Sequence, residues 1–416
     1  MQTRWRRRLL GLFTTYRWVD LDNSRADRRW WREPFGVFDG FAVGFIAAVA
    51  LALLVRNGGL EPFVSDTWYH LAIAKQINVQ DALPSWVDWD YAPVGRPHLY
   101  PPLIHVLLAG LARLTGSVLI AGRILAVLFL PASYLSCWFV ARWIFGPRNA
   151  LVGVLLLSLD VGHAVVELLY IPSCVVNILA PPLIITLLTR RTWASIVLLT
   201  LMLYAHIAIP YLVVLGLGLF GLKYPRYRGE VLKVIGVALL WASPWAVRTF
   251  MEREWVAGAA MNAGLPMGLL QRILSLQMFN LVLIGCGLWG IFRLRKSRAQ
   301  EAIVRWMLLG MLPLLFSYGG RFTMHSAPFW AISASTVLVR LLPAWATWRR
   351  AAALTAATLL PSPALLPLTT THAIVMLAVT GKPIMASDRE KSEALLPDCD
   401  EAMRWVEQHT QPGDVV

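Results

Sequence analysis

Long apolar runs separated by short polar turns fill most of the chain. Many of these runs approach the roughly 20 residues that an α-helix needs to cross the hydrocarbon core of a bilayer. The pattern therefore predicts an all-α polytopic membrane protein with about eleven transmembrane helices. The predicted spans are 35–56, 117–141, 150–168, 174–189, 192–208, 210–222, 231–248, 269–292, 302–318, 325–342 and 351–378.

One apolar segment, 101–114, departs from this pattern. It is too short to cross a bilayer, and it carries His105 and Arg113. We expect it to form a peripheral or re-entrant helix at the edge of the membrane. The first two predicted spans are then joined by a large loop, 57–116.

Composition agrees with a membrane protein, since 57% of the 416 residues are apolar and only 15% are charged. The net charge of +14 could indicate nucleic-acid binding, but its distribution argues against that. Residues 1–34 hold nine arginines interleaved with tryptophans, which is typical of a cytoplasmic anchor beside lipid headgroups. The loop 57–100 holds five acids and two bases, as expected on the opposite side.

These features predict three parts of the chain. Residues 1–34 form a basic cytoplasmic segment, and residues 35–378 form the transmembrane domain. Alternation of an odd number of spans places the C-terminus outside the cell. We expect 379–416 to begin an extracytoplasmic soluble segment that continues beyond residue 416.

The first outer loop carries the strongest candidate for chemistry, the segment Ser65–His70. Asp66 and His70 are four residues apart, so they share one face of a helix. A carboxylate here could deprotonate a substrate hydroxyl or hold a divalent cation. Trp68 and Tyr69 are aromatic residues of the kind found at membrane interfaces. The alternative is that Asp66 only caps the helix that follows.

Three further segments hold candidate residues. Asp88 and Asp90 form a D-x-D pattern that could bind a metal and a diphosphate, or could simply be a solvated loop. The segment 160–167 holds Asp160, His163 and Glu167. Acids near the membrane interior usually face a cavity, so this segment is a candidate for a functional role.

Arg321 lies in a predicted outer turn, where the distribution of charge disfavours arginine. It could bind a lipid phosphate, or it could reach toward headgroups without a specific role.

Five segments resemble motifs of the GT-C superfamily, the polytopic glycosyltransferases that use polyprenyl-phosphate-linked sugars. Ser65–His70 resembles the first-loop motif, and Asp160–Glu167 falls where the second acidic motif is expected. Gly320–Phe322 resembles the late arginine-containing loop. Tyr100–Leu103 looks like the segment that leads back into the bilayer. Ala402–Val416 resembles the helix and turn that open the soluble outer domain of many members.

The resemblance implies an integral membrane enzyme that transfers a sugar from a polyprenyl-phosphate donor to a protein, glycan or lipid acceptor on the extracytoplasmic face. Asp66 would act as base or metal ligand, and Asp160 or Glu167 would complete the site. In the metal-dependent alternative, a divalent cation, Mg²⁺ or Mn²⁺, would be held by Asp66 and Asp160. The side chains expected to contact substrate are His70, Trp68, Tyr69, His163, Arg321 and His325.

A carrier or flippase for lipid-linked saccharides is the main alternative. Such a protein is expected to hold charged residues along a path through mid-span and to contain broken helices in paired positions. In this sequence the ionisable groups gather at the predicted outer ends of the spans, which favours the enzyme.

Overall fold

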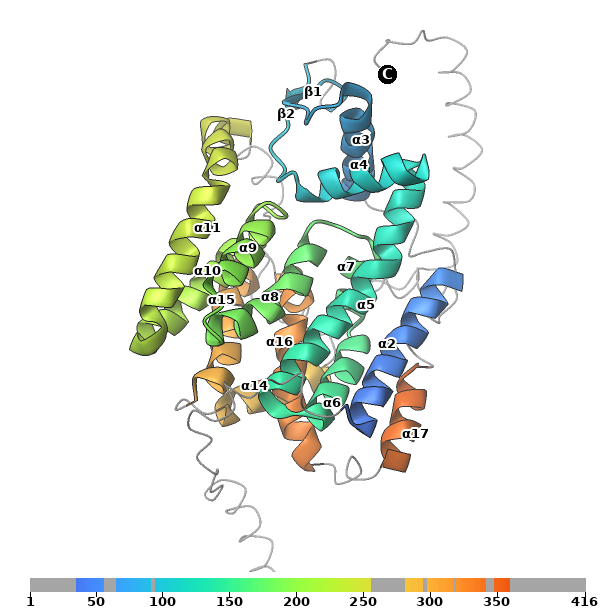
Figure 1. Ribbon diagram of the computed structural model, residues 1–416, viewed down its shortest axis with the longest axis vertical. Coiled ribbons are helices and arrows are strands. Elements are labelled where there is room, and N and C mark those ends of the chain that lie inside the picture. Colours follow the sequence, from blue (N-terminus) through green and yellow to red (C-terminus); the bar gives the residue numbers. More distant parts are fainter. Residues whose placement is uncertain are drawn as a thin grey trace, which may run out of the picture. The chain divides into compact units, whose positions relative to one another are not determined.

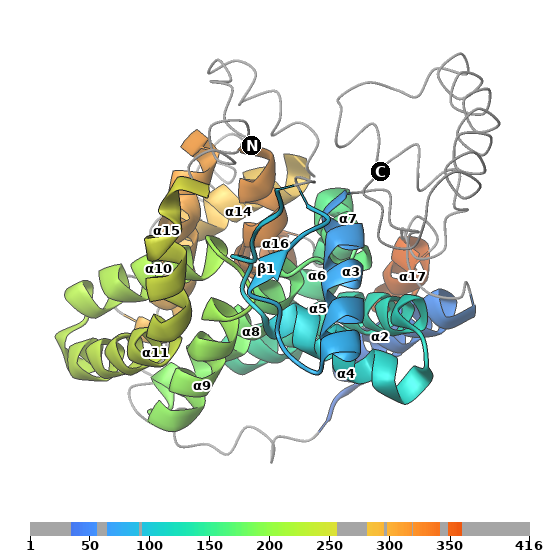
Figure 2. The same ribbon diagram turned by 90° about the horizontal axis from the view of Figure 1, so that it is seen from above.

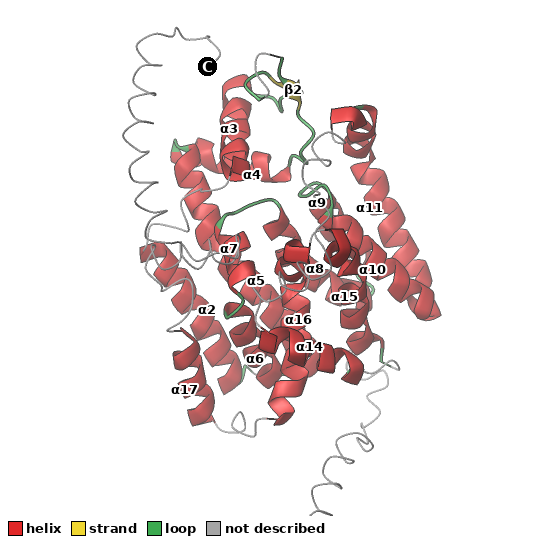
Figure 3. Cartoon of the chain, turned by 180° about the vertical axis from the view of Figure 1, so that it is seen from behind, coloured by secondary structure: helices red, strands yellow, loops and turns green. Residues whose placement is uncertain are grey.

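The computed structural model describes residues 35–55, 65–90, 94–255, 281–294, 298–317, 319–341 and 348–359. The predicted segments 1–34 and 379–416 lie outside these residues. Almost every described element is a helix (Figure 3). The elements are α2 Val37–Val55, α3 Ser65–Gln80, β1 Trp86–Val87, β2 Arg96–Pro97, α4 Leu103–Thr115, α5 Val118–Phe145, α6 Pro147–Ser158, α7 Val161–Leu168, α8 Ser173–Leu188, α9 Thr192–Leu203, α10 Ile209–Lys223, α11 Pro225–Met251, α14 Leu281–Arg293, α15 Ala299–Ser317, α16 Gly319–Leu341 and α17 Trp348–Leu359.

The helices pack around α5 and α16. Helix α5 contacts α2, α4, α6 and α8, while α16 contacts α6, α14 and α15 (Figure 1). At the crossing of α10 and α15, a Cβ on Gly310 would lie 2.6 Å from the Cα of Gly216. These two glycines therefore allow the backbones to approach closely, as small residues do between membrane helices.

A buried ion pair joins the start of α2 to the end of α5. Arg142 Nε lies 2.8 Å from Asp39 Oδ1, and both side chains are buried. The backbone N–H of Gly36 donates to the other carboxylate oxygen of Asp39 at 3.0 Å. The start of α2 and the end of α5 consequently lie at the same end, as alternating spans require.

The first loop forms a small layer of its own at the other end of α5. Helix α3, the β1–β2 hairpin and α4 lie together there, as Figure 2 shows from above. The two strands are antiparallel, with Trp86 opposite Pro97. Apolar side chains of α3 and Val87 of β1 form a second core with α4 and the first half of α5. The backbone N–H of Leu103 donates to the carbonyl of Tyr204, which fastens this layer to the end of α9.

Two tight corners follow from local sequence. Gly116 adopts a left-handed conformation with φ of 73° after α4, and the Ser117 side chain then accepts a hydrogen bond from the N–H of Ile120. This is the usual glycine stop and serine start of two successive helices. His206 makes the other corner, because its Nδ1 accepts the N–H groups of Ala208 and Ile209 at the start of α10.

Only some of the eleven predicted spans are seen as helices long and apolar enough to cross a bilayer. In the described part of the chain, α2, α5 and α11 are long and apolar enough to cross a bilayer, and the pair α6–α7 makes a fourth candidate if counted as one span. That pair is bent by 78°, so the predicted span 150–168 is two helices. Segment 101–114 forms the short helix α4, as expected. The count of eleven spans stays a prediction.

Candidate active site

Asp66 lies in the first turn of α3, with its side chain exposed. The next residue, Thr67, is fully buried, and its hydroxyl donates to the carbonyl of Leu169 at 3.4 Å. The start of α3 is therefore held beside the residue that follows α7. The Asp66 carboxylate lies in that first turn, where it stabilises the N-terminus of α3. His70 is one turn further along the same helix, but it is only 1% exposed because α4 covers it. The shared face that the spacing predicts thus runs from the surface into the core.

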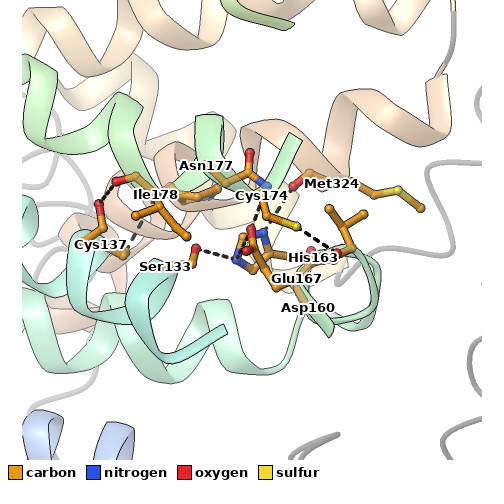
Figure 4. Close-up of polar contacts among 12 residues, drawn as sticks. Ser133, Cys137, Asp160, His163, Glu167, Cys174, Asn177, Ile178 and Met324 are labelled. Atoms are coloured by element: carbon orange, nitrogen blue, oxygen red, sulfur yellow. Dashed lines mark hydrogen bonds and ion pairs between the residues drawn. The ribbon is translucent and has the colours of Figure 1, made fainter. Parts of the chain in front are cut away.

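The second acidic segment forms a buried polar network around α7 (Figure 4). Asp160 Oδ1 accepts the backbone N–H of His163 at 2.8 Å, so Asp160 caps α7 at the bend after α6. Asn177 of α8 donates its amide to Glu167 Oε1 at 2.9 Å. Asp160, His163 and Glu167 are all 1% exposed or less. This network will be called the α7 network, with Ser133 of α5 as its fifth member.

His163 connects the α7 network to two more helices, and its partners define its tautomer. One ring nitrogen, Nδ1, is 3.3 Å from the carbonyl of Met324 in α16, and the other, Nε2, is 2.9 Å from the hydroxyl of Ser133. A carbonyl only accepts, so Nδ1 carries the proton and Nε2 accepts from Ser133. Glu167 Oε1 lies 3.9 Å from His163 Nε2. This contact is an ion pair only if His163 is protonated.

A second polar group, the histidine cluster, consists of His70, His98 and His105. His70 Nδ1 and His105 Nε2 are 2.8 Å apart, and the rings of His98 and His105 have centroids 4.9 Å apart. Tyr69 places its hydroxyl 2.7 Å from His98 Nδ1. Tyr100 packs edge-on against His70 at 4.8 Å.

The histidine cluster is held uncharged by its surroundings. Burial lowers the pKa of His70 to about 3, with further lowering by His98 and His206. Burial also lowers the pKa of His98 to about 4, and Arg248 and Arg96 act in the same direction. The pKa of His105 is lowered well below its usual range, again mainly by burial. These imidazoles are therefore neutral at physiological pH.

The two polar groups meet at the start of α16. Met324 accepts from His163, and the next residue, His325, is buried with its ring centroid 6.3 Å from that of His206. His206 in turn contacts Tyr100 of the first loop at 6.2 Å. The structure thus brings together segments from α3, α4, α7, the α9–α10 turn and α16.

Most of the predicted site residues take part in this arrangement. His163, Asp160 and Glu167 belong to the α7 network, and His70, Tyr69 and His325 lie in or beside the histidine cluster. Trp68 is 52% exposed on α3 next to Asp66. The backbone of Arg321 lies in the first turn of α16, while its side chain lies outside the described residues. Asp90 of the D-x-D pattern is paired with Arg96 at 2.6 Å, which fits the solvated-loop alternative.

The fit to a divalent cation can be tested on the donor atoms. Asp160 Oδ2 and Glu167 Oε2 are buried and have no hydrogen-bond partner among the described residues. However, no three His, Cys, Asp or Glu side chains of the described residues are arranged to hold a metal ion. The His, Cys, Asp and Glu side chains of the described residues therefore do not form a preassembled metal site.

Several residues of the site were not predicted as such. His98, Tyr100, Ser133 and Asn177 all bind or pack against predicted members. Asn177 is a lone amide in the apolar run 173–188, and polar residues inside such runs generally mark function or specific pairing. That signal could have identified Asn177. Nothing in the sequence brings His98 to His105.

No family model matches the chain, and no curated protein matches it in sequence. Solved structures do match. ArnT from Cupriavidus metallidurans bound to undecaprenyl phosphate aligns with a TM-score of 0.56 and 17% identity, over 82% of this chain and 69% of ArnT. The Archaeoglobus fulgidus oligosaccharyltransferase in complex with Zn and sulfate aligns with a TM-score of 0.53 and 15% identity, over 76% of this chain and 53% of that enzyme.

A further match is the archaeal oligosaccharyltransferase AglB from Archaeoglobus fulgidus in complex with an inhibitory peptide and a dolichol-phosphate. It aligns with a TM-score of 0.52 and 13% identity, over 81% of this chain and 56% of AglB. The chain thus spans little more than half the length of the oligosaccharyltransferases it matches. These likenesses establish the fold, which the chain shares with ArnT and the archaeal oligosaccharyltransferases.

Proposed function

We propose that this chain is a GT-C-type glycosyltransferase that transfers a sugar from a polyprenyl-phosphate-linked donor to an acceptor on the extracytoplasmic face of a membrane. The observation that carries the proposal is the fold shared with ArnT bound to undecaprenyl phosphate and with AglB in complex with a dolichol-phosphate. The position of Asp66 supports it, because an exposed carboxylate stands where the first loop meets the helix bundle.

In this proposal Asp66 is the base. Its carboxylate takes the proton of the acceptor hydroxyl while the acceptor oxygen bonds to the anomeric carbon. The bond between that carbon and the phosphate oxygen breaks, and the polyprenyl phosphate leaves with the electron pair. Arg321, in the first turn of α16, would stabilise the negative charge that develops on this phosphate.

Asp160 and Glu167 complete the site from α7. Both are buried. Asp160 caps α7, Glu167 accepts from Asn177 of α8, and His163, which lies between them, joins α7 to α16. Because Leu169 follows α7 directly and holds Thr67, the α7 network also sets the position of Asp66. We propose that their second carboxylate oxygens face the reacting groups.

The test is sugar transfer by the full-length protein in membranes, with labelled polyprenyl-phosphate sugars as donors. Asp66→Asn is expected to lower the rate by at least about 100-fold, within the usual contribution of a general base. Asp88→Asn, an exposed acid of the same loop, is the matched control and is expected to leave the rate unchanged. Equal rates for Asp66→Asn and wild type would remove Asp66 from the chemistry. Repeating the assay with EDTA distinguishes a general base from a metal ligand. Loss of transfer with EDTA would show that Asp66 acts as a ligand of a divalent cation.

The rival function is a lipid-linked saccharide carrier. The bend between α6 and α7 and the buried Asp160 and Glu167 favour it, because broken helices and interior acids are typical of transporters. Only one such bend is seen among the described helices. Flipping of a fluorescent polyprenyl-phosphate sugar across proteoliposomes, with no transfer for any donor, would establish the carrier instead.

A further inference from the structure

The histidine cluster has hydrogen-bonding capacity that the protein itself does not use. His70 Nε2, His98 Nε2 and His105 Nδ1 are buried and have no hydrogen-bond partner among the described residues. The three rings are at most 1% exposed. An unmade hydrogen bond on a buried polar atom is costly, so such atoms normally face a ligand or an ordered water. Three of them lie in one group of touching rings, and a ligand or water that enters among the rings would satisfy them.

The tautomers show what the occupant must offer. A neutral imidazole has one N–H and one lone pair. In the hydrogen bond between His70 and His105 one ring donates and the other accepts. Whichever ring donates, one of the two remaining nitrogens is then an N–H and the other is a lone pair. The pair therefore presents one donor and one acceptor to its occupant.

His98 adds a third hydrogen-bonding position. The Tyr69 hydroxyl lies 2.7 Å from His98 Nδ1, and burial raises the pKa of Tyr69 to about 12, so the phenol keeps its proton. If the Tyr69 O–H donates to Nδ1, Nε2 of His98 carries the proton, and if Nδ1–H donates to the phenol oxygen, Nε2 accepts. In either case the cluster offers three positions that include at least one N–H donor and one acceptor. Hydroxyl groups, which donate and accept at once, satisfy such a set, whereas a carboxylate or phosphate satisfies only its donors.

Uncharged rings that offer both donors and acceptors favour a neutral ligand over an anion. Arg96 and Arg248 lie close enough to disfavour a proton on His98. Arg96 also stacks over the Tyr69 ring, with its guanidinium carbon 5.5 Å from the ring centroid. The cationic groups are thus engaged at the rim, and the buried rings are uncharged. Aromatic faces combined with a few fixed polar atoms are typical of sites for small neutral ligands.

We propose that His70, His98 and His105, flanked by Tyr69 and Tyr100, form a subsite for a neutral sugar ring, which they bind through its hydroxyls. The inference rests on the proposed function, in which a sugar must be held near Asp66. His70 lies one turn from Asp66 on α3, so a ring bound at the cluster is within reach of that carboxylate. The sugar can be that of the donor or of the acceptor.

The test uses direct binding. Full-length protein in nanodiscs is irradiated with octyl glycosides of glucose, galactose, mannose and arabinose that carry a photoreactive diazirine, and with the matching octyl phosphate. Labelled peptides are mapped by mass spectrometry. At least one glycoside is expected to label residues 65–80 or 94–115, and the phosphate is not. Labelling is expected to fall at least about fivefold in His98→Phe and in His105→Phe, as for one or more lost hydrogen bonds.

Controls keep the outcome clear. His98→Gln restores an N–H donor and is expected to recover part of the labelling, which a merely structural role of His98 would not produce. Tyr227→Phe removes a phenol hydroxyl outside the cluster and is expected to change nothing. The proposal is overturned if the wild type is not labelled, because the cluster then holds only water, or if the phosphate labels it equally.

Sugar transfer measured in parallel separates this inference from the proposed function. Histidine-dependent labelling without any transfer would leave the subsite standing and reject the enzyme. Transfer without histidine-dependent labelling would reject the subsite alone. Where both hold, His98→Phe is expected to raise the KM of the substrate whose sugar occupies the site by about fivefold. A rise for the donor or for the acceptor identifies the source of that sugar.

Discussion

The α7 network and the histidine cluster are both buried and polar, yet they differ in which atoms lack a partner among the described residues. In the α7 network these are acceptor oxygens of Asp160, Glu167 and Asn177, and in the histidine cluster they are ring nitrogens. Both ring nitrogens of His163 have partners, one on α5 and one on α16. Each ring of the histidine cluster has one engaged nitrogen and one without a partner among the described residues. The α7 network therefore joins α5, α7, α8 and α16 and leaves only acceptor oxygens without a partner in the described part of the chain, while the histidine cluster leaves ring nitrogens that can donate or accept.

The strongest way to break this comparison is to remove the acceptor at the centre of the α7 network. Glu167→Ala leaves the Asn177 amide buried without its acceptor and also opens a cavity. We expect the free energy of unfolding to fall by about 2–4 kcal/mol. Glu167→Gln keeps a carbonyl oxygen for Asn177 and is expected to cost less than about 1 kcal/mol. The measurement is SDS or thermal unfolding of the purified protein in detergent.

Glu254→Ala is the control for this pair, since Glu254 is an exposed acid just after α11. It is expected to leave stability unchanged. If Glu167→Ala were as stable as wild type, the α7 network would not be a support, and its acids would be free for another role.

The next largest effect separates the two regions by pH. The pKa values of His70 and His98 in the folded chain, about 3 and about 4, lie below the usual value near 6.5. As pH falls, the unfolded chain binds protons first, so stability is greatest above about pH 6.5 and is lost as pH decreases toward 4. Between pH 7 and pH 5 we expect a loss of about 1–2 kcal/mol for each histidine.

We expect this loss of stability to arise from protonation of the cluster histidines, with contributions from neighbouring charged groups. The titratable and charged groups that face it are Tyr69, Asp90, Arg96, Tyr100, His206 and Arg248. A His70→Leu, His105→Leu double variant is expected to lose clearly less stability than wild type between pH 7 and pH 5. An identical pH dependence in both proteins would show that these histidines are not the groups that titrate.

A smaller effect is expected for the coupling between His70 and His105 within the cluster. His70→Leu and His105→Leu each leave the other imidazole without its hydrogen bond. The double variant removes both partners, and buried apolar replacements of this kind can be nearly neutral. We therefore expect the double variant to be about 1 kcal/mol more stable than the sum of the single variants predicts. Strict additivity would mean that the 2.8 Å contact contributes nothing.

The sequence was informative wherever a property depends on neighbours along the chain. The predicted spans 35–56 and 117–141 correspond to α2 and α5, because length and unbroken apolar composition determine such helices. It was less informative at 150–168, where the apolar run continues through a bend. There Asp160 caps a new helix, and an acid in an apolar run gives no sign of which way the chain turns.

The site shows the same limit. Helical spacing indicated that Asp66 and His70 share a face of α3, but not that α4 would bury one of them. His70 and His105 are 35 residues apart, and Thr67 and Leu169 are 102 apart. Such pairings depend on how helices pack, and periodicity identifies a buried face without naming its partner.

The contact between Thr67 and Leu169 gives the smallest and most specific prediction. Thr67→Val removes a single neutral hydrogen bond of 3.4 Å at nearly constant volume, so stability should fall by about 0.5–1 kcal/mol. Thr249→Val deletes a comparable bond within α11 and serves as the control. Under the proposed function, only Thr67→Val should slow sugar transfer, by roughly threefold through kcat with KM unchanged, because Asp66 then loses its fixed position. An equal change in both variants would mean that α3 is positioned by its apolar packing, and that the α7 network supports the bundle without orienting Asp66.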